Sequence, residues 1–341
     1  MHPLSRSPAP RRALAGFAGR AGRTALATLA LLAPLAPASA QSYPNRQVTI
    51  VIPFPPGGGI DVLVRAMASD LTTRWKQSVI IENRPGAGSL TGAGLVAKAA
   101  PDGYTLMATV NQTMTANPFL YKSLPYDPVK SFAPITMLAG SDMLVLANPN
   151  LPANNLRELV ELVKREPGKH NFGSFGLGSQ PHLMFALLNR RENIDLLHVP
   201  FNGIAPLITA LTGGHVELTT ATPSVGGELL KSGRLKALAI AGKTRSRSFA
   251  SVPTTAEAGY PYLRVAIWHA LFAPRGVPND LINQIQRDVK AVLSNPEFDA
   301  KQVSGKELNL YASTPAELAA TIEEETATMA EMVKIANIKP E

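Results

Sequence analysis

The chain has 341 residues, 45% of them hydrophobic, which is enough to bury a sizeable core and to form two lobes. The formal net charge of +8 includes five arginines and no acids in the first 40 residues, so the remainder carries +8 − 5 = +3. With 6% aromatic residues and no basic run interleaved with aromatics, the sequence excludes a nucleic-acid-binding protein. Cysteine is absent and the histidines form no H-x-x-x-H or H-E-x-x-H pair, so we expect no disulfide and no zinc or other metal site.

The first 40 residues have the pattern of a secretory signal peptide. The basic start is followed by the apolar stretch "ALATLALLAPLA" and by "ASA", a small-residue cleavage pattern. The alternative, a membrane anchor, is disfavoured because the stretch is shorter than about 20 residues and is broken by Pro34 and Pro37. We therefore expect residues 1–40 to be removed after Ala40 and the mature chain to lie in the periplasm.

The mature sequence begins with a β-α-β-α-β pattern. The expected strands are residues 47–54, 77–83 and 104–110, and the expected helices are 59–75 and 88–100. This order predicts parallel strands with helices packed on the sheet, an α/β fold.

A second alternating set follows without a linker. Expected strands are 142–149, 170–176, 196–201, 216–222, 235–242 and 265–274, and expected helices are 155–166, 181–191, 204–214, 225–233, 278–295 and 314–336. Asn279 or Asp280 is a candidate cap for the helix at 278–295, and Thr314 with Glu317 forms a capping box. We assign residues 41–142 and 266–341 to one lobe and 143–265 to the other, with crossing strands between them and a ligand cleft at their junction.

Two glycine loops join a strand to a helix. The glycines at 57–59 allow backbone N–H groups to turn toward an anion at the positive end of a helix, with Asp61 in the first turn. Ile60 and Asp61 stand where a phosphate-binding loop needs lysine and a hydroxyl, and a plain turn with an acidic cap is the alternative. The loop at 173–182 has the same design, with Ser179 as a candidate N-cap.

Catalytic and nucleotide-binding interpretations of these glycine loops are weak. Ser174 and Ser179 do not stand in a G-x-S-x-G motif, and His182 fits a helix cap or packing role. Gly86, Gly88 and Gly92 miss the G-x-G-x-x-G spacing. Few lysines or arginines flank these loops, so weakly charged carboxylates fit better than phosphates.

The motifs "PFPPGGGIDVLVR", "IENRPGAGSLTGA", "LPYDPVKSFAPIT", "GSFGLGSQPHL", "HVPFNG" and "LFAPRGVP" occur in one order. From about Tyr43 to the C-terminus, the chain resembles the Bug-type solute receptors of tripartite tricarboxylate transporters. The resemblance implies a two-lobe periplasmic binding protein of type II, a "Venus flytrap", without catalysis or cofactor. It also implies a monomer that binds a small organic acid and delivers it to the membrane permease of the same transporter.

Carried over motif by motif, the resemblance places ligand-binding residues on both walls of the cleft. Asn202 stands where the motif would have lysine. A sensor that presents its ligand to a signalling partner, or an enzyme that uses Ser174 or His182 on a carboxylate compound, are the alternatives. The predicted ligand-binding residues are Phe54, Gly57, Gly58, Gly59, Asp61, Ser174, Gly178, Ser179, His182 and Asn202.

Overall fold

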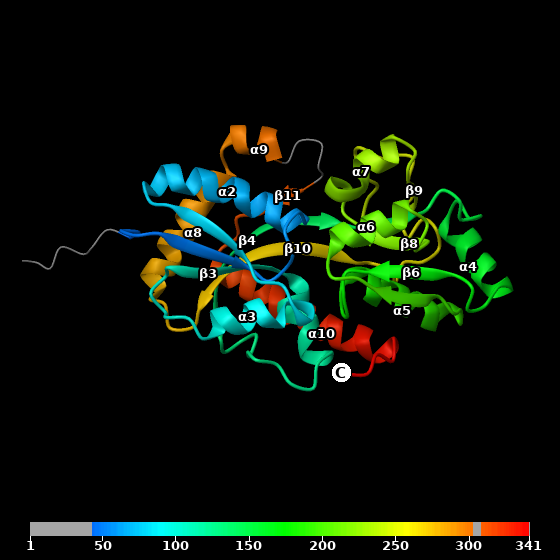
Figure 1. Ribbon diagram of the computed structural model, residues 1–341, viewed down its shortest axis with the longest axis horizontal. Helices are drawn as coiled ribbons and strands as arrows, with labels where there is room; N and C mark the ends of the chain where they lie inside the picture. Colours follow the sequence, from blue (N-terminus) through cyan, green and yellow to red (C-terminus); the bar gives the residue numbers. More distant parts are fainter. Residues whose placement is uncertain (1–42, 303–307, 341) are drawn as a thin grey trace, which may run out of the picture. The chain divides into compact units, whose positions relative to one another are not determined.

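The computed structural model describes residues 43–302 and 308–340, apart from the side chains of residues 301 and 302. The predicted signal peptide and its cleavage site lie outside the described residues. Two β-sheets, each covered by helices on both faces, make up the described part of the chain (Figure 1). No helix in these ranges is both long and apolar enough to span a membrane.

The first sheet has six strands in the order β11-β4-β10-β3-β1-β2. Its strand β1 pairs in parallel with β2 and with β3, which confirms the predicted β-α-β-α-β unit. Strand β10 lies antiparallel between β3 and β4. The strands are β1 (Val48–Ile52), β2 (Val79–Asn83), β3 (Thr105–Val110), β4 (Phe132–Asp142), β10 (Ala266–Pro274) and β11 (Asn309–Leu310).

The second sheet has five strands in the order β7-β6-β8-β5-β9. Strand β6 is parallel to β7 and β8, whereas β5 is antiparallel to β8 and β9. The strands are β5 (Leu144–Ala147), β6 (Asn171–Ser174), β7 (Leu197–Pro200), β8 (Leu218–Ala221) and β9 (Lys236–Ile240).

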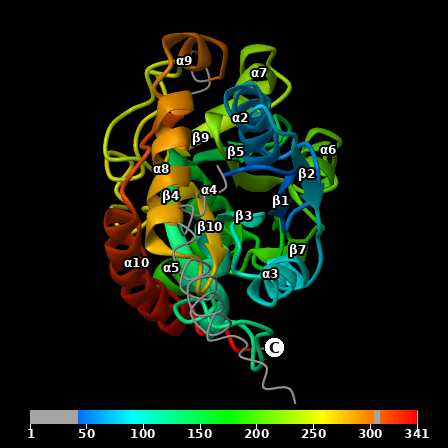
Figure 2. The ribbon, with the colours of Figure 1, turned by 90° about the vertical axis from the view of Figure 1, so that its left-hand side faces the viewer.

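Helices cover both sheets on both faces. In the first sheet, α2 and α8 pack on one face and α3 and α10 on the other, as Figure 2 shows. In the second, α4 and α5 pack opposite α6 and α7. The helices are α2 (Gly59–Trp75), α3 (Leu90–Ala97), α4 (Leu156–Arg165), α5 (Gln180–Glu192), α6 (Ile204–Thr212), α7 (Pro223–Lys231), α8 (Asn279–Leu293), α9 (Pro296–Gln302) and α10 (Pro315–Ile335), with short helical turns η2 (Ala87–Ser89), η3 (Gln112–Ala116) and η4 (Asn117–Phe119).

Sequence periodicity explains why these helices form and how they pack. On α2 the predicted apolar stripe at Ile60, Val64, Met67 and Leu71 is buried against the first sheet. Burial of each such side chain contributes about 1.5–3 kcal/mol, which fixes the helix and the loop that precedes it. The capping box at the start of α10 is also present as predicted, with the Thr314 hydroxyl accepting from the backbone N–H of Glu317.

Two details differ from the sequence prediction. Strand β4 was missed over most of its length, because its segment "FAPITMLAGSD" contains proline and glycine, which weaken a strand pattern. The expected cap of α8 at Asn279 or Asp280 was wrong: the N-cap is Pro278, and Asn279 is already helical. Proline is favoured near a helix start because its fixed φ matches the helix.

The chain passes between the sheets at two places. Met143 alone separates β4 in the first sheet from β5 in the second. The return runs from the end of β9 to the start of β10 at Ala266. The long strands β4 and β10 run through the middle of Figure 1, so the ends of both sheets meet there.

Candidate functional site

A cavity of about 70 Å³ lies where the two sheets meet. Within the described part of the chain, no aspartate, glutamate, lysine or arginine lines it. Ligand pockets for drug-sized molecules usually measure about 300–1,000 Å³, so this one holds a few atoms unless its walls move apart. Its lining residues are Phe54, Pro55, Gly58, Gly59, Ile60, Val110, Met143, Phe175, Gly203, Ile204, Ala221, Thr222, Val225, Ile267 and His269.

Three helix starts converge on this cavity. Gly58 and Gly59 belong to the start of α2, Ile204 is the first residue of α6, and Thr222 is the N-cap of α7. Each helix start carries unpaired N–H groups and about half a positive elementary charge, so together they favour an anion.

The first N–H groups of α2 are available to a ligand. Among the described residues, no acceptor lies against the backbone N–H of Gly59 or of Ile60. Opposite them, Gly203 approaches so closely that a Cβ built on it would lie 3.0 Å from Pro55 Cγ. The cavity walls therefore belong to both halves of the molecule and touch at its rim.

Of the residues predicted to bind the ligand on the first glycine loop, Phe54, Gly58 and Gly59 line the cavity, and Pro55 and Ile60 of the same segment line it too. Gly57 has a φ of +87°, and its N–H donates to Asp61 Oδ2 at 3.0 Å. Asp61 is buried outside the lining and accepts further hydrogen bonds of 3.0 Å from Arg65 Nε and from Asn83 Nδ2. Burial opposes ionisation, yet these hydrogen bonds hold the pKa of the Asp61 carboxyl below its ordinary value. In this structure Asp61 fixes the shape of the loop.

The second glycine loop is held by its own side chains. Ser179 Oγ donates to the carbonyl oxygen of Gly176 at 2.6 Å, and Ser174 Oγ lies 2.7 Å from His198 Nε2. Both serines are fully buried and neither lines the cavity, whereas Phe175 between them does. Direct contact of these two hydroxyls with a ligand stays a prediction.

The histidine beside this loop has a structural partner on each side. Gly178 N–H donates to His182 Nδ1 at 3.0 Å, and the His182 ring stacks on His198 with centroids 4.3 Å apart. Burial, and to a smaller degree His198, lowers the pKa of His182 to about 3. Gly178 and His182 lie outside the cavity lining, and Asn202 is exposed and also outside it, so their ligand contacts stay predictions.

Strand β10 supplies a wall that sequence analysis did not predict. Side chains alternate along a strand, so Ile267 and His269 both face the cavity, while Trp268 donates to Glu325 of α10 on the other face. His269 is only 2% exposed, and burial lowers its pKa to about 4, which keeps the ring neutral at pH 7. A histidine in the apolar segment "VAIWHALFAP", on a strand expected to cross between lobes, is the signal that would have indicated it.

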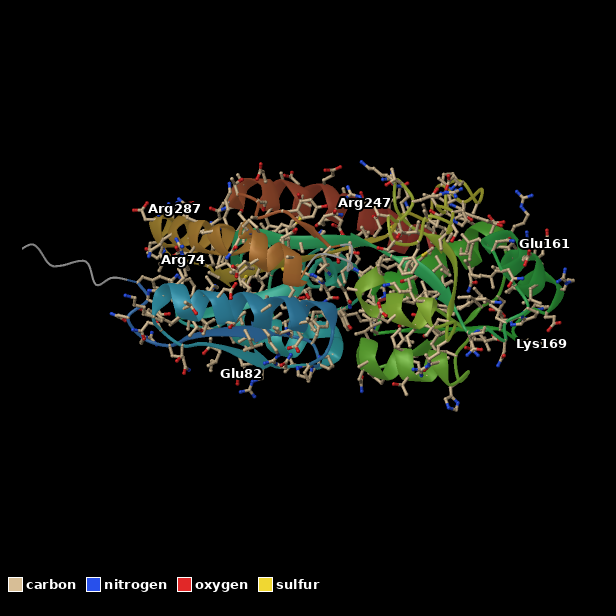
Figure 3. All side chains as sticks on the ribbon, turned by 90° about the horizontal axis from the view of Figure 1, so that it is seen from above. Arg74, Glu82, Glu161, Lys169, Arg247 and Arg287 are labelled. Atoms are coloured by element: carbon tan, nitrogen blue, oxygen red, sulfur yellow. The ribbon has the colours of Figure 1, made fainter. Side chains whose placement is uncertain are left out.

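The charged side chains labelled in Figure 3 lie away from the cavity. They project from the outside of the molecule, and none of them lines the cavity. No three aspartate, glutamate, histidine or cysteine side chains lie close enough to hold a metal ion within residues 43–302 and 308–340. The labelled residues are Arg74, Glu82, Glu161, Lys169, Arg247 and Arg287.

Comparison with known proteins agrees with this architecture. The sequence profile of the tripartite tricarboxylate transporter family receptors, TctC, matches residues 63–338. The chain belongs to this family. The resemblance noted from the sequence motifs is thereby confirmed, and the protein is a periplasmic solute-binding protein with the α/β, two-lobe fold of that class.

Relatives match over most of their length. Protein BugT of Bordetella pertussis is 34% identical over 258 residues, which are 75% of this chain and 79% of BugT. The periplasmic binding protein BugD matches with a TM-score of 0.82 and 31% identity, over 88% of this chain and all of BugD. Two further structures hold carboxylates.

The structure of Rpa4515 from R. palustris with adipate has a TM-score of 0.84 and 30% identity, over 88% of this chain and 100% of that one. MatC from Rhodopseudomonas palustris with bound malate has a TM-score of 0.81 and 32% identity, over 85% of this chain and 100% of MatC. The neighbours are therefore binding proteins.

Proposed function

We propose that this receptor binds a small organic carboxylate in the cavity between its two sheets and delivers it to the membrane permease of a tripartite transporter. The observation that carries the proposal is the convergence of three helix starts, those of α2, α6 and α7, on a cavity without a charged lining side chain. The adipate of Rpa4515 and the malate of MatC support a carboxylate as the ligand class.

Neutral donors suit a carboxylate better than a phosphate. A carboxylate carries one negative charge, which several helix starts of about half a positive charge each can balance. A hydrogen bond to a charged group contributes about 1.5–3 kcal/mol, so a few backbone N–H groups account for micromolar binding. The apolar side chains that make up most of the lining would cover the carbon skeleton of the ligand.

The small volume of the cavity implies a hinge. We assign residues 41–142 and 266–341 to one lobe and 143–265 to the other, with rotation at Met143 and near Ala266. In this proposal the lobes separate to admit the acid and close on it, as a single chain that acts as a monomer after removal of residues 1–40.

A thermal-shift screen of organic acids on the chain from Gln41 onward tests the proposal. A ligand that binds only the native state raises the unfolding temperature, and calorimetry then gives the affinity and stoichiometry. The variant Ile204→Trp, which places a large ring in the cavity, serves as the control and should lose the shift. Recovery of the acid chemically altered would indicate an enzyme, and the absence of any shift with the native protein would contradict the proposal.

A further inference from the structure

His269 occupies the centre of the cavity wall. It lies in the middle of β10, paired with Val110 of β3 and Ala139 of β4, so the backbone holds it in place on both sides. Its Cε1 lies 3.8 Å from the point where a Cβ on Gly59 would stand, beside the start of α2. The imidazole is therefore a fixed part of the site.

The ring carries an unpaired polar atom. Its Nδ1 is buried and has no hydrogen-bond partner among the described residues. A buried polar group left without a partner is costly, and such groups are rare in native structures. Thr222 is the other polar side chain in the lining, and its hydroxyl already bonds to Ser224 Oγ at 2.7 Å. The partner that His269 lacks has to come from the ligand or from water.

Closure of the two lobes on the acid, as proposed above, would remove water from the cavity. A bound acid with a purely apolar tail would leave the imidazole unpaired in a drier cavity, while the helix starts satisfy its carboxylate. An acid with a second oxygen, as a hydroxyl or a second carboxyl group, would complete the hydrogen bonding of the ring. Sites built to bond a polar group reject analogues that lack it more strongly than apolar pockets reject an extra methylene.

We propose that His269 determines the specificity of this receptor by hydrogen bonding to a second oxygen-bearing group of the acid, so that hydroxy acids and dicarboxylates bind in preference to simple fatty acids. This inference rests on the proposed function. The proposed function places one carboxylate of the ligand at the helix starts, and this inference adds a role for the rest of the ligand.

Matched probes test it. Butyrate, 3-hydroxybutyrate and succinate share four carbons, and hexanoate and adipate share six, so each set varies mainly in the second oxygen group. Calorimetry on the native protein should give an affinity at least about ten-fold higher for the best oxygen-bearing acid than for its fatty acid. In His269→Leu that ratio should fall to about one, and His269→Gln, which keeps a hydrogen-bonding side chain, should restore part of it.

Stability provides an independent readout and a matched control. His269→Leu removes an unpaired polar group from an apolar wall, so its unfolding temperature without ligand should equal or exceed that of the native protein. Thr220→Val is the control, because Thr220 Oγ1 is likewise buried and unpaired but Thr220 does not line the cavity. This variant should keep the native preference.

The outcomes separate the two proposals. If the native protein binds none of the five acids, this inference is overturned, and the proposed function is overturned as well only if the whole screen of organic acids gives no shift. If the acids bind but His269→Leu retains the native preference, or loses affinity equally for all of them, only this inference is overturned.

Discussion

Gln180 Nε2 donates a hydrogen bond of 2.6 Å to Asn111 Oδ1, and this bond joins α5 beside the second sheet to the segment that follows β3 in the first. Asn111 in turn donates to Glu325 Oε1 of α10 at 2.6 Å. Nearby, Gln112 Nε2 donates to the carbonyl oxygen of Leu177 at 2.7 Å. The two halves are therefore connected by buried polar contacts in addition to the chain crossings.

We expect Gln180→Met to weaken ligand binding. The substitution removes the 2.6 Å bond and leaves Asn111 Oδ1 buried without that partner, which costs about 1–3 kcal/mol in the closed arrangement. In the proposed hinge mechanism only the closed form holds the acid, so the apparent affinity should fall about ten-fold. Calorimetry measures the affinity, with Gln286→Met as the control, because Gln286 bonds to the carbonyl oxygen of Ser313, between β11 and α10, and so makes no contact between the halves. Equal affinities in both variants would argue against an interlobe role.

Two glycines at the rim should respond differently to a methyl group. Gly203 has a φ of +111°, and its Cβ would lie 3.0 Å from Pro55, so Gly203→Ala should cost about 1–3 kcal/mol and weaken binding. Gly58 has a φ of −77°, with Ile204 Cγ2 at an ordinary 3.5 Å, so Gly58→Ala should fold normally. Chemical unfolding and calorimetry compare the pair. A Gly203→Ala protein as stable as Gly58→Ala would show that the backbone there adapts.

The neutral His182 should make the protein less stable in acid. Its pKa is lowered to about 3, so below its ordinary value of 6.5 the unfolded chain binds a proton that the folded chain does not. The free energy of unfolding should therefore fall by roughly 1 kcal/mol per pH unit between about pH 6 and pH 4 on account of this residue. Urea unfolding of the native protein and of His182→Phe over this range isolates the effect. If the free energy of unfolding falls with pH equally in the two proteins, His182 is not the cause.

We expect Asp61 to contribute more to the stability of the folded protein than to the affinity for the ligand. Asp61→Asn weakens the ion pair with Arg65 Nη2, 3.0 Å from Oδ1, and disturbs the acceptor for the N–H of Gly57. We expect a loss of about 1–3 kcal/mol in the free energy of unfolding, with a smaller loss of ligand affinity through the displaced loop. Asp70→Asn on the same helix is a control, since Asp70 is exposed. A large gain in anion affinity would instead place the Asp61 carboxylate against the ligand.

Local sequence pattern predicted much of the fold because local physics decides it. The apolar stripe of α2 and the Thr314–Glu317 capping box are fixed by residues three or four positions apart. The sequence pattern did not predict β4, because this strand is stabilised by pairing with β10, more than 120 residues away in the chain. This pairing accommodates Pro134 within the sheet. Tertiary pairing there overrides local propensity.

The site was only partly predictable for the same reason. Phe54, Gly58 and Gly59 were found from a local glycine loop that precedes a helix. The starts of α6 and α7 carry no such loop, and His269 lies in a strand, so their meeting at one cavity depends on how the two sheets pack. Conversely, the hydroxyl of Ser174 bonds to His198 and that of Ser179 to the carbonyl oxygen of Gly176, and the sequence alone does not reveal these partners.

The most direct test of carboxylate binding between the sheets is a crystal structure of the protein grown with the best acid from the screen. We expect density in the cavity lined by Gly58, Ile204 and His269, with a carboxylate within hydrogen-bonding distance of backbone N–H groups at the helix starts. An acid bound elsewhere on the molecule, with this cavity empty, would contradict it.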